Sequence, residues 1–368
     1  MRRLTLNDVK AAVKGGSIFA SGGGGWVDHG LEIGSAAITI GRPKLVSIDE
    51  LPDDAIIVTA TAIGAPAGTT DWQMLGKDYI KAVQLLQERL GRKITGLMTP
   101  QNGMSSSING WLPAAALDLV VVDAVGDIRA HPTGKMGSLG LAGSLDYETI
   151  QVVAGGKPET GSYIELVVTG TPAKTSNILR IASDMSGGFI ACARHPLPAK
   201  FIKENAALGG ISRAIELGNA IIKAEKEDTS KVVDAICQTT KGKIIGQGTV
   251  IKKEIRYSVG YDIGTITIDT EDGLLTLHVM NEYMAVDNQK GQRVASFPDV
   301  ITTLEPGTGR PVSVGHVKEG EQLSIFNIAK ENLPLSTGVK DSSVYPEVEK
   351  VLGIDLAKYA LEGHALVR

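Results

Sequence analysis

The chain contains SIFASGGGGWVDH at residues 17–29, where four consecutive glycines, Gly22–Gly25, separate an apolar run from an expected helix over 28–38. Residues without a Cβ are costly to order, so folded chains keep them where the backbone needs φ > 0 or where something approaches the main chain closely. We expect a first helix ending at Gly15-Gly16, then a strand, then a glycine loop whose N–H groups face an anion or a ring carbonyl. The alternative is a flexible surface loop. No Lys-Ser/Thr follows the run, so it is not a P-loop.

Strand-like and helical patterns alternate through the first 240 residues. Short β-branched runs at Lys44–Ile48 and Ala55–Ala62 predict strands, and further strands are expected at 94–98 and 119–123. The clearest amphipathic helix is Trp72–Leu90, in which apolar residues recur every three or four positions. This alternation predicts an α/β fold with a largely parallel sheet covered by helices, in which ligands bind where loops leave the carboxyl ends of strands.

From about residue 243 the pattern becomes all-β. Glu271-Asp272-Gly273 lies between two alternating runs and predicts a β-hairpin, because Asp-Gly supplies the φ > 0 positions of a tight turn. Further short strands separated by Gly and Pro predict a small β-barrel or β-sandwich. The expected organisation is an α/β domain over residues 1–165, a mixed helical segment of open assignment over 166–240, a β-barrel domain over 241–335 and a C-terminal segment over 336–368.

The composition of the chain argues against nucleic-acid binding and against membrane-spanning segments. The 368 residues carry a net charge of −4 and only 4% aromatic residues, so neither a basic face nor stacking platforms for nucleic acid are expected. No apolar stretch approaches the ~20 residues needed to span a bilayer. Cys192 and Cys237 have no metal-binding spacing and are expected to be reduced thiols. We predict a cytoplasmic homo-oligomer that binds a small molecule, and neither nucleic acid nor membranes.

Two loops collect polar side chains. The segment Asp127–Lys135 holds an acid, a guanidinium, an imidazole and an ammonium just beyond an apolar strand, which is typical of a poised acid/base site and also of a structural ion-pair cluster. The loop Pro100–Ser107 carries Gln101 and Asn102, which could bind a planar polar ring or simply form a turn. A G-x-S-x-G elbow is missing from the sequence, which argues against a serine hydrolase of the α/β type.

The chain carries, in this order, Gly22–Gly25, Gly64-Ala65-Pro66, Asp123 with Asp127, Arg129-Ala130 and Pro132, Asn281-Glu282, and Phe297–Ile301. Together these pieces resemble the S-methyl thiohydantoin desulfurase-like family over nearly the whole chain. The resemblance implies an N-terminal three-layer α/β domain followed by a β-barrel domain similar to the C-terminal part of hydantoinase and oxoprolinase subunits. It also implies hydrolytic removal of sulfur from a thiohydantoin ring.

The chain departs from the family pattern in two places. An acid usually follows the glycine run directly, whereas here Trp26-Val27 precede Asp28. Acids expected in the Pro100 loop and after Pro132 are replaced by Gln101-Asn102 and Thr133-Gly134. These replacements leave substrate and metal dependence open.

The resemblance predicts a hydrolase of five-membered cyclic amides or thioamides, in which water attacks the ring carbon bearing sulfur and a thiol leaves. Such a reaction needs a base, donors for charge developing on the ring, and an anchor for any substrate carboxylate. We expect His131 or Asp28 as the base with His29 as a partner, and Arg129 as the anchor. Gly22, Gly23, Gly24 and Gly25 would supply the donors, and Gln101 and Asn102 would contact the substrate.

The sequence leaves open whether the protein binds a metal and whether it is an enzyme. A divalent metal such as zinc could lower the pKa of the attacking water. The candidate ligands are Asp28, His29, His131 and His195, although the sequence does not establish a metal. The competing hypothesis is a non-catalytic small-molecule-binding or regulatory subunit associated with hydantoin metabolism, which the missing acids favour.

Overall fold

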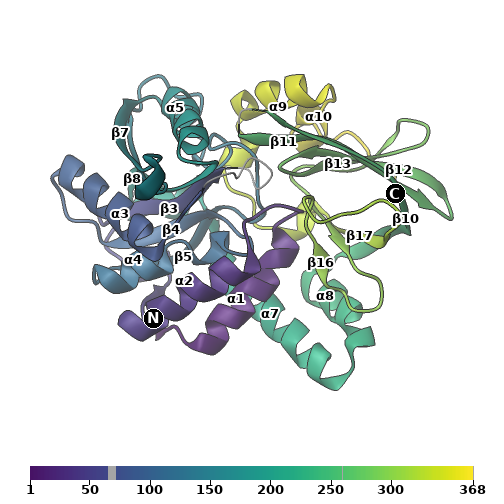
Figure 1. Cartoon of the computed structure of the whole chain (residues 1–368), viewed down its shortest axis with the longest axis horizontal. Helices are drawn as coiled ribbons and strands as arrows, with labels where there is room; N and C mark the ends of the chain where they lie inside the picture. The colour runs from purple at the N-terminus through teal and green to yellow at the C-terminus, as the bar shows by residue number, and fades with distance from the viewer. Residues whose placement is uncertain (65–71, 259, 368) are drawn as a thin grey trace.

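The computed structural model describes residues 1–64, 72–258 and 260–367 and contains two sheets, each with its own helices (Figure 1). The first is a nine-stranded mixed sheet covered by helices, and the second is an eight-stranded antiparallel sheet. The predicted combination of an α/β domain with an all-β domain is confirmed. Of the family segment Gly64-Ala65-Pro66, only Gly64 lies within the described residues.

The α/β unit extends to Thr240. Its strands are β1 (Arg2–Arg3), β2 (Lys44–Val46), β3 (Ile56–Gly64), β4 (Gly96–Gln101), β5 (Val120–Asp127), β6 (Thr149–Gly155), β7 (Ile164–Gly170), β8 (Phe189–Pro198) and β9 (Ala207–Leu208). Its helices are α1 (Leu6–Phe19), α2 (Val27–Ile40), α3 (Gly76–Leu90), α4 (Trp111–Ala116), α5 (Pro172–Met185), α6 (Ala199–Asn205), α7 (Gly210–Glu227) and α8 (Val232–Thr240).

The strand order of this sheet is β1-β2-β5-β4-β3-β8-β6-β7, with β9 paired to β5. The pairs β2–β5, β5–β4 and β4–β3 are parallel, whereas β8 pairs antiparallel with both β3 and β6. The sheet is therefore mixed rather than largely parallel, because β8 and the β6–β7 pair extend it with antiparallel strands. The segment 166–240, which the sequence did not assign, supplies the internal strand β8 to this sheet.

Helices cover both faces of the sheet. Alternate residues of a strand point to opposite faces, so Val58 of β3 faces the core that includes α1–α4 and α7, while Ile57 faces the core beneath α6. Leu179 of α5 packs with Cys192 of β8 on that second face. These contacts give three layers, helix–sheet–helix.

The start of the chain differs from expectation. Residues 17–20 were expected to form a strand after a helix ending at Gly15-Gly16, but α1 continues through Phe19. The two glycines lie at close backbone contacts within α1 rather than at its end: a Cβ built on Gly15 would lie 1.9 Å from the Ala214 carbonyl oxygen of α7, and one built on Gly16 would lie 2.3 Å from the Gly103 carbonyl oxygen. The glycine run Gly22–Gly25 therefore follows a helix and leads into α2.

The second unit contains β10 (Lys243–Ser258), β11 (Tyr261–Thr270), β12 (Gly273–Met280), β13 (Glu282–Asn288), β14 (Arg293–Ser296), β15 (Val300–Leu304), β16 (Pro311–Val312) and β17 (Gln322–Ile328). They pair antiparallel in the order β14-β13-β12-β11-β10-β17-β15-β16. The predicted hairpin is confirmed, with Thr270 opposite Gly273 across the turn. Val286 of β13 and Ile301 of β15 share one core, so the sheet curls around its own interior.

The two units pack tightly against each other. The helices α9 (Tyr345–Leu352) and α10 (Ala357–Ala360) follow the second sheet. The Thr302 hydroxyl of β15 donates to the Ile18 carbonyl of α1, and Val300 belongs to the same apolar core as the α/β helices. This junction positions the end of α1, and hence the glycine run, against the second sheet.

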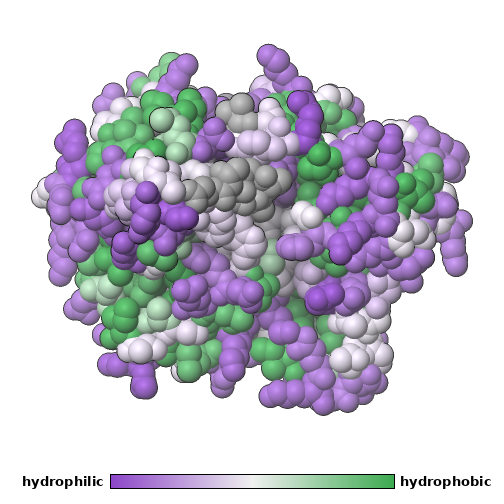
Figure 2. Space-filling model, in the orientation of Figure 1, coloured by the Kyte–Doolittle hydropathy of each residue, from purple (hydrophilic) through white to green (hydrophobic). Residues whose placement is uncertain are grey.

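The visible surface mixes residue types. Figure 2 shows hydrophilic side chains spread across this face, with smaller hydrophobic areas between them. Within the described ranges, no helix is long and apolar enough to cross a membrane.

Candidate functional site

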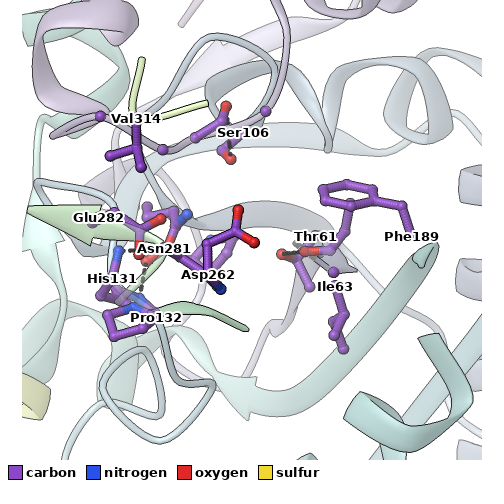
Figure 3. A pocket seen from close by; sticks show the side chains of 18 of the residues that line it. Thr61, Ile63, Ser106, His131, Pro132, Phe189, Asp262, Asn281, Glu282 and Val314 are labelled. Carbon is purple, nitrogen blue, oxygen red and sulfur yellow. Dashed lines mark hydrogen bonds between the residues drawn. The ribbon is translucent and has the colours of Figure 1, made fainter. Parts of the chain in front are cut away.

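A cavity of about 100 Å³ lies where the two units meet. This is well above the roughly 10–15 Å³ that one ordered water requires, so the cavity can accept a small ring. The glycine run Gly22–Gly25, Gln101 and His131 line it from the α/β unit, and Asp262, Asn281 and Glu282 line it from the second unit. Figure 3 shows His131, Asn281 and Glu282 gathered on one side of the pocket, with Thr61, Ile63 and Phe189 on the other.

The glycine run forms a packed wall of this cavity. Gly22, Gly24 and Gly25 have φ of +86°, +80° and +86°, which side-chain-bearing residues rarely adopt. A Cβ on Gly23 would lie 2.2 Å from Glu282 Oε1, and one on Gly25 would lie 1.9 Å from Ser105 Oγ. The run is therefore held by close neighbours and is not a flexible surface loop.

Glu282 is a buried acid that lines the cavity. Glu282 is 4% exposed, and its Oε2 atom has no hydrogen-bond partner among the described residues. Burial raises the pKa of the Glu282 carboxyl to about 8, and nearby Asp262 adds to the rise while Arg129 and Arg180 oppose it. A carboxyl with this pKa is largely protonated at neutral pH and can donate a proton.

Asp262 and Asn281 hold the strand ends beside Glu282. The Asn281 N–H donates to the Asp262 carbonyl over 2.8 Å, and the Asp262 N–H donates to Asn281 Oδ1 over 2.8 Å. Asn281 alone links β12 to β13, with a φ of 58° that asparagine tolerates better than most residues. This reciprocal pair brings the two carboxyl groups of β11 and β13 to the same cavity.

His131 lies in the cavity but is a weak base. Its Nε2 lies 3.4 Å from the Pro100 carbonyl, and its backbone N–H donates to Gln101 Oε1 over 3.1 Å. Burial lowers the pKa of His131 to about 3, with the Arg194 and Arg129 charges adding to the effect. The imidazole is therefore neutral across the physiological range, which disfavours the expected role of general base.

Asp127 and Arg129, at the start of the Asp127–Lys135 loop, do not line the cavity, whereas Pro132, Thr133 and Gly134 do. The Arg129 guanidinium is buried and donates to the carbonyls of Ala130, Asp299 and Tyr283 at 2.8–2.9 Å. These three hydrogen bonds link the loop to the second unit. The guanidinium does not line the cavity. Asp127 is also fully buried, and burial raises the pKa of its carboxyl to about 7.

Asp28, His29 and Asn102 also lie outside the cavity lining. Asp28 is exposed in the first turn of α2, and His29 Nε2 lies 3.1 Å from the Tyr79 hydroxyl. Asn102 is buried, where its Nδ2 donates to the Gly210 carbonyl and its Oδ1 accepts from the Ser107 hydroxyl. The structure therefore does not bring Asp28 and His29 together with His131.

The four candidate metal ligands do not converge. His195 is buried on β8, where its Nδ1 lies 3.0 Å from Thr149 Oγ1, and it does not line the cavity. Across residues 1–64, 72–258 and 260–367, no group of three or more His, Cys, Asp or Glu side chains is arranged to hold a metal ion. The donor set thus does not fit a zinc site built from Asp28, His29, His131 and His195.

Four ionisable residues of the cavity were given no site role from the sequence: Arg180, Arg194, Asp262 and Glu282. Arg194 directly follows the apolar run Phe189–Ala193, and a charge inside an otherwise apolar strand is the signal that could have revealed it. Asp262 and Arg180 occur in ordinary strand and helix patterns, so nothing local distinguishes them from solvated charges.

Comparisons with known proteins agree with this architecture. The family model described as the S-Me-THD-like N-terminal domain matches residues 7–155, and the S-Me-THD-like C-terminal domain matches residues 171–337. An X-ray crystal structure of a protein from Chromobacterium violaceum superposes with a TM-score of 0.70 at 21% identity, over 100% of this chain and 98% of that chain, which shows a shared fold. No curated protein matches the chain. Since the two family models together span most of its length, the chain belongs to the S-Me-THD-like, or S-methyl thiohydantoin desulfurase-like, family.

Proposed function

We propose that the protein is a hydrolase of five-membered cyclic amides or thioamides of the thiohydantoin type, in which water displaces a thiol from a ring carbon. Membership of the S-Me-THD-like family supports a thiohydantoin-type ring as the substrate. The observation that carries the chemistry is the Glu282 carboxyl, which is buried against Gly23, lines the cavity and keeps an unpartnered oxygen. A protonated carboxyl in that position can deliver a proton to a departing sulfur.

The two carboxyl groups of the cavity divide the acid and base roles. We assign Glu282 as the proton donor and Asp262 as the carboxylate that takes a proton from water.

The proton and bond changes balance for an S-alkyl thiohydantoin. The water oxygen bonds to the ring carbon, one water proton goes to Asp262, and the C–S bond breaks as Glu282 protonates the sulfur. The second water proton moves to the ring nitrogen as the carbonyl forms. Transfer of the proton from Asp262 to Glu282 then restores the enzyme, and the products are a thiol and a hydantoin.

Donors for the developing charge come from the glycine loop and from β4. The N–H groups of Gly24 and Gly25 donate no hydrogen bond to any described residue. The side-chain amide nitrogen of Gln101 likewise has no acceptor in the described part of the chain. The side-chain oxygen of Gln101 accepts from the His131 backbone N–H. Such pre-positioned donors can stabilise negative charge on a ring oxygen or nitrogen.

Thiol release tests this function directly. The full-length chain is incubated with an S-methyl thiohydantoin, the parent thiohydantoin and a hydantoin, while free thiol and ring absorbance are followed. We expect stoichiometric methanethiol release from the S-methyl ring, with heat-denatured protein as the control. Ring binding without any turnover would reject the hydrolase and favour a non-catalytic binding subunit.

A further inference from the structure

We propose that the ring substrate carries a carboxylate substituent and that Arg194 binds it. The identity of the ring rests on the proposed function, whereas the anionic substituent rests on the geometry around Arg194. This residue lies on β8, between Thr59 of β3 and Gln151 of β6 in the sheet register.

The Arg194 side chain is buried. The residue is 3% exposed, yet its side chain makes no hydrogen bond or ion pair with any residue in the described ranges, and its Nε is fully enclosed. Burying a charge is costly unless it is paired, so an unpaired buried arginine points to an anion that is supplied from outside.

The other two arginines near the cavity are already hydrogen-bonded to the protein. Arg129 donates to three backbone carbonyls, and Arg180 donates to the carbonyls of Gly64, Gly260 and Pro132. Arg180 also lies over the Tyr261 ring, with its Cζ 4.5 Å from the ring centroid. Of the three, Arg194 is the one whose guanidinium makes no hydrogen bond to a described residue, so all of its donors are available to a ligand.

The space beside Arg194 is small and positively charged. Arg194 lines the main cavity and also an adjoining cavity of about 20 Å³, which Lys135, Arg180 and Ser176 line as well. None of the described residues lining this small cavity is acidic. A Cβ on Gly134 would lie 2.4 Å from Arg194 Nη1, so the glycine leaves room for the guanidinium at this wall.

The two units line the cavity with different ionisable groups. Burial and the neighbouring Arg180 lower the pKa of Arg194, and the Arg194 charge in turn lowers the pKa of His131. Glu282, which is largely protonated at neutral pH, and Asp262 line the cavity from the second unit. A ring with a carboxylate toward Arg194 and its sulfur toward Glu282 matches both ends.

A carboxylate fits this position in particular. The planar arginine fork binds a carboxylate through two parallel hydrogen bonds. The adjoining cavity has room on the order of one or two waters, which suits a small planar anion.

Calorimetric binding of a matched ligand pair tests the proposal. The probes are a hydantoin with a carboxymethyl substituent and the same ring with the neutral carboxamide in its place. We expect the wild-type chain to prefer the acid by about 10²-fold, the usual worth of hydrogen bonds between charged groups. Arg194→Gln should abolish this preference, and Arg194→Lys should retain part of it, because lysine keeps the charge but loses the fork.

The control and the opposing outcomes are separable from the test of hydrolysis. Arg92→Gln makes the same charge change at an exposed residue outside the cavity lining and should keep the full preference. Thermal unfolding reports whether Arg194→Gln is folded, and removal of an unpaired buried charge should not lower its Tm. Equal binding of acid and amide by the wild type, or an unchanged preference in folded Arg194→Gln, overturns the proposal. Acid preference without thiol release rejects only the hydrolase.

Discussion

Replacing Glu282 with glutamine is expected to lower kcat/KM for thiol release by about 10²-fold or more, the usual contribution of a positioned general acid. The substitution keeps the size of the side chain, so its packing against Gly23 and its place in the cavity are retained. Only the proton is lost. Methanethiol release from an S-methyl thiohydantoin measures the effect, with Glu271→Gln, at the exposed hairpin turn, as the matched control.

The pH dependence identifies the residue responsible. Because the pKa of Glu282 is raised to about 8, the wild-type kcat/KM should fall as the pH rises above that value and the proton donor is lost. This limb should be missing in Glu282→Gln. His131, with a pKa lowered to about 3, should add no limb near neutral pH. A wild-type profile that is unchanged in Glu282→Gln would refute the assignment.

The same substitution is expected to stabilise the fold at alkaline pH. In the unfolded chain the carboxyl ionises near 4.5, whereas in the folded chain it stays protonated up to about 8. The folded state therefore binds more protons in this window, and the contribution of Glu282 to stability falls as the pH rises from about 4.5 to about 8.

Glutamine does not titrate, so the Tm advantage of the variant should grow through this window and then level off. A difference on the order of a few kcal/mol follows from 1.36 kcal/mol per pKa unit. Asp127, whose pKa burial raises to about 7, adds a similar pH dependence to both proteins and cancels in the comparison. Thermal unfolding at pH 5 and pH 9 measures the difference, and an equal Tm offset at both pH values would contradict it.

The sequence predicted the fold better than the site. Periodicity and turn chemistry located β3, α3, α4 and the β11–β12 hairpin, because each of these depends on residues close together in the chain. The mixed direction of the first sheet could not be read in this way. It depends on β8 pairing with β3, more than a hundred residues earlier in the chain.

Long-range packing also decides which of the predicted site residues line the cavity. Gly22–Gly25, Gln101 and His131 follow or precede strands and helices at the sheet edge, and the structure brings them to one cavity. Asp28 and His29 are adjacent to the glycine run in sequence, yet α2 carries them away from it. Arg129 shares a loop with His131, but three carbonyls turn it inward. Local proximity predicts where a loop lies, and long-range packing decides which side chains face the ligand.

Histidine and glutamate in this cavity also differ from what their ordinary pKa values suggest. Histidine near a glycine loop suggests a base because its ordinary pKa lies near neutrality. Burial reverses this expectation, since it disfavours the charged form of every group: it lowers the pKa of His131 and raises that of Glu282. Glu282 follows Asn281 at a strand end, where acids are usually solvated, and only the three-dimensional burial distinguishes it.

Substituting alanine for Gly218 is expected to destabilise the protein by about 3 kcal/mol or more, against the usual gain from replacing a glycine within a helix. Gly218 lies on α7 where this helix crosses α1, and the two helices are side by side in Figure 1. A Cβ on Gly218 would lie 1.8 Å from the Ala11 carbonyl oxygen, and one on Gly15 would lie 1.9 Å from the Ala214 carbonyl oxygen. Both obstacles are backbone atoms, so the helices must separate to accept a methyl group.

Thermal unfolding measures the effect, with a Tm lowered by roughly 6 °C or more. The matched control is Asn219→Ala, at the next position of α7, where the side chain is exposed and alanine should be neutral or slightly stabilising. Gly15→Ala should reproduce the loss, because it meets the same interface from the other helix. The double variant should cost less than the sum of the two, since helices already separated by one methyl group can accommodate the second more easily. A Gly218→Ala protein as stable as Asn219→Ala would show that α1 and α7 do not cross this closely. In that case the glycine run, which directly follows α1, would lose the anchor that holds it against Glu282.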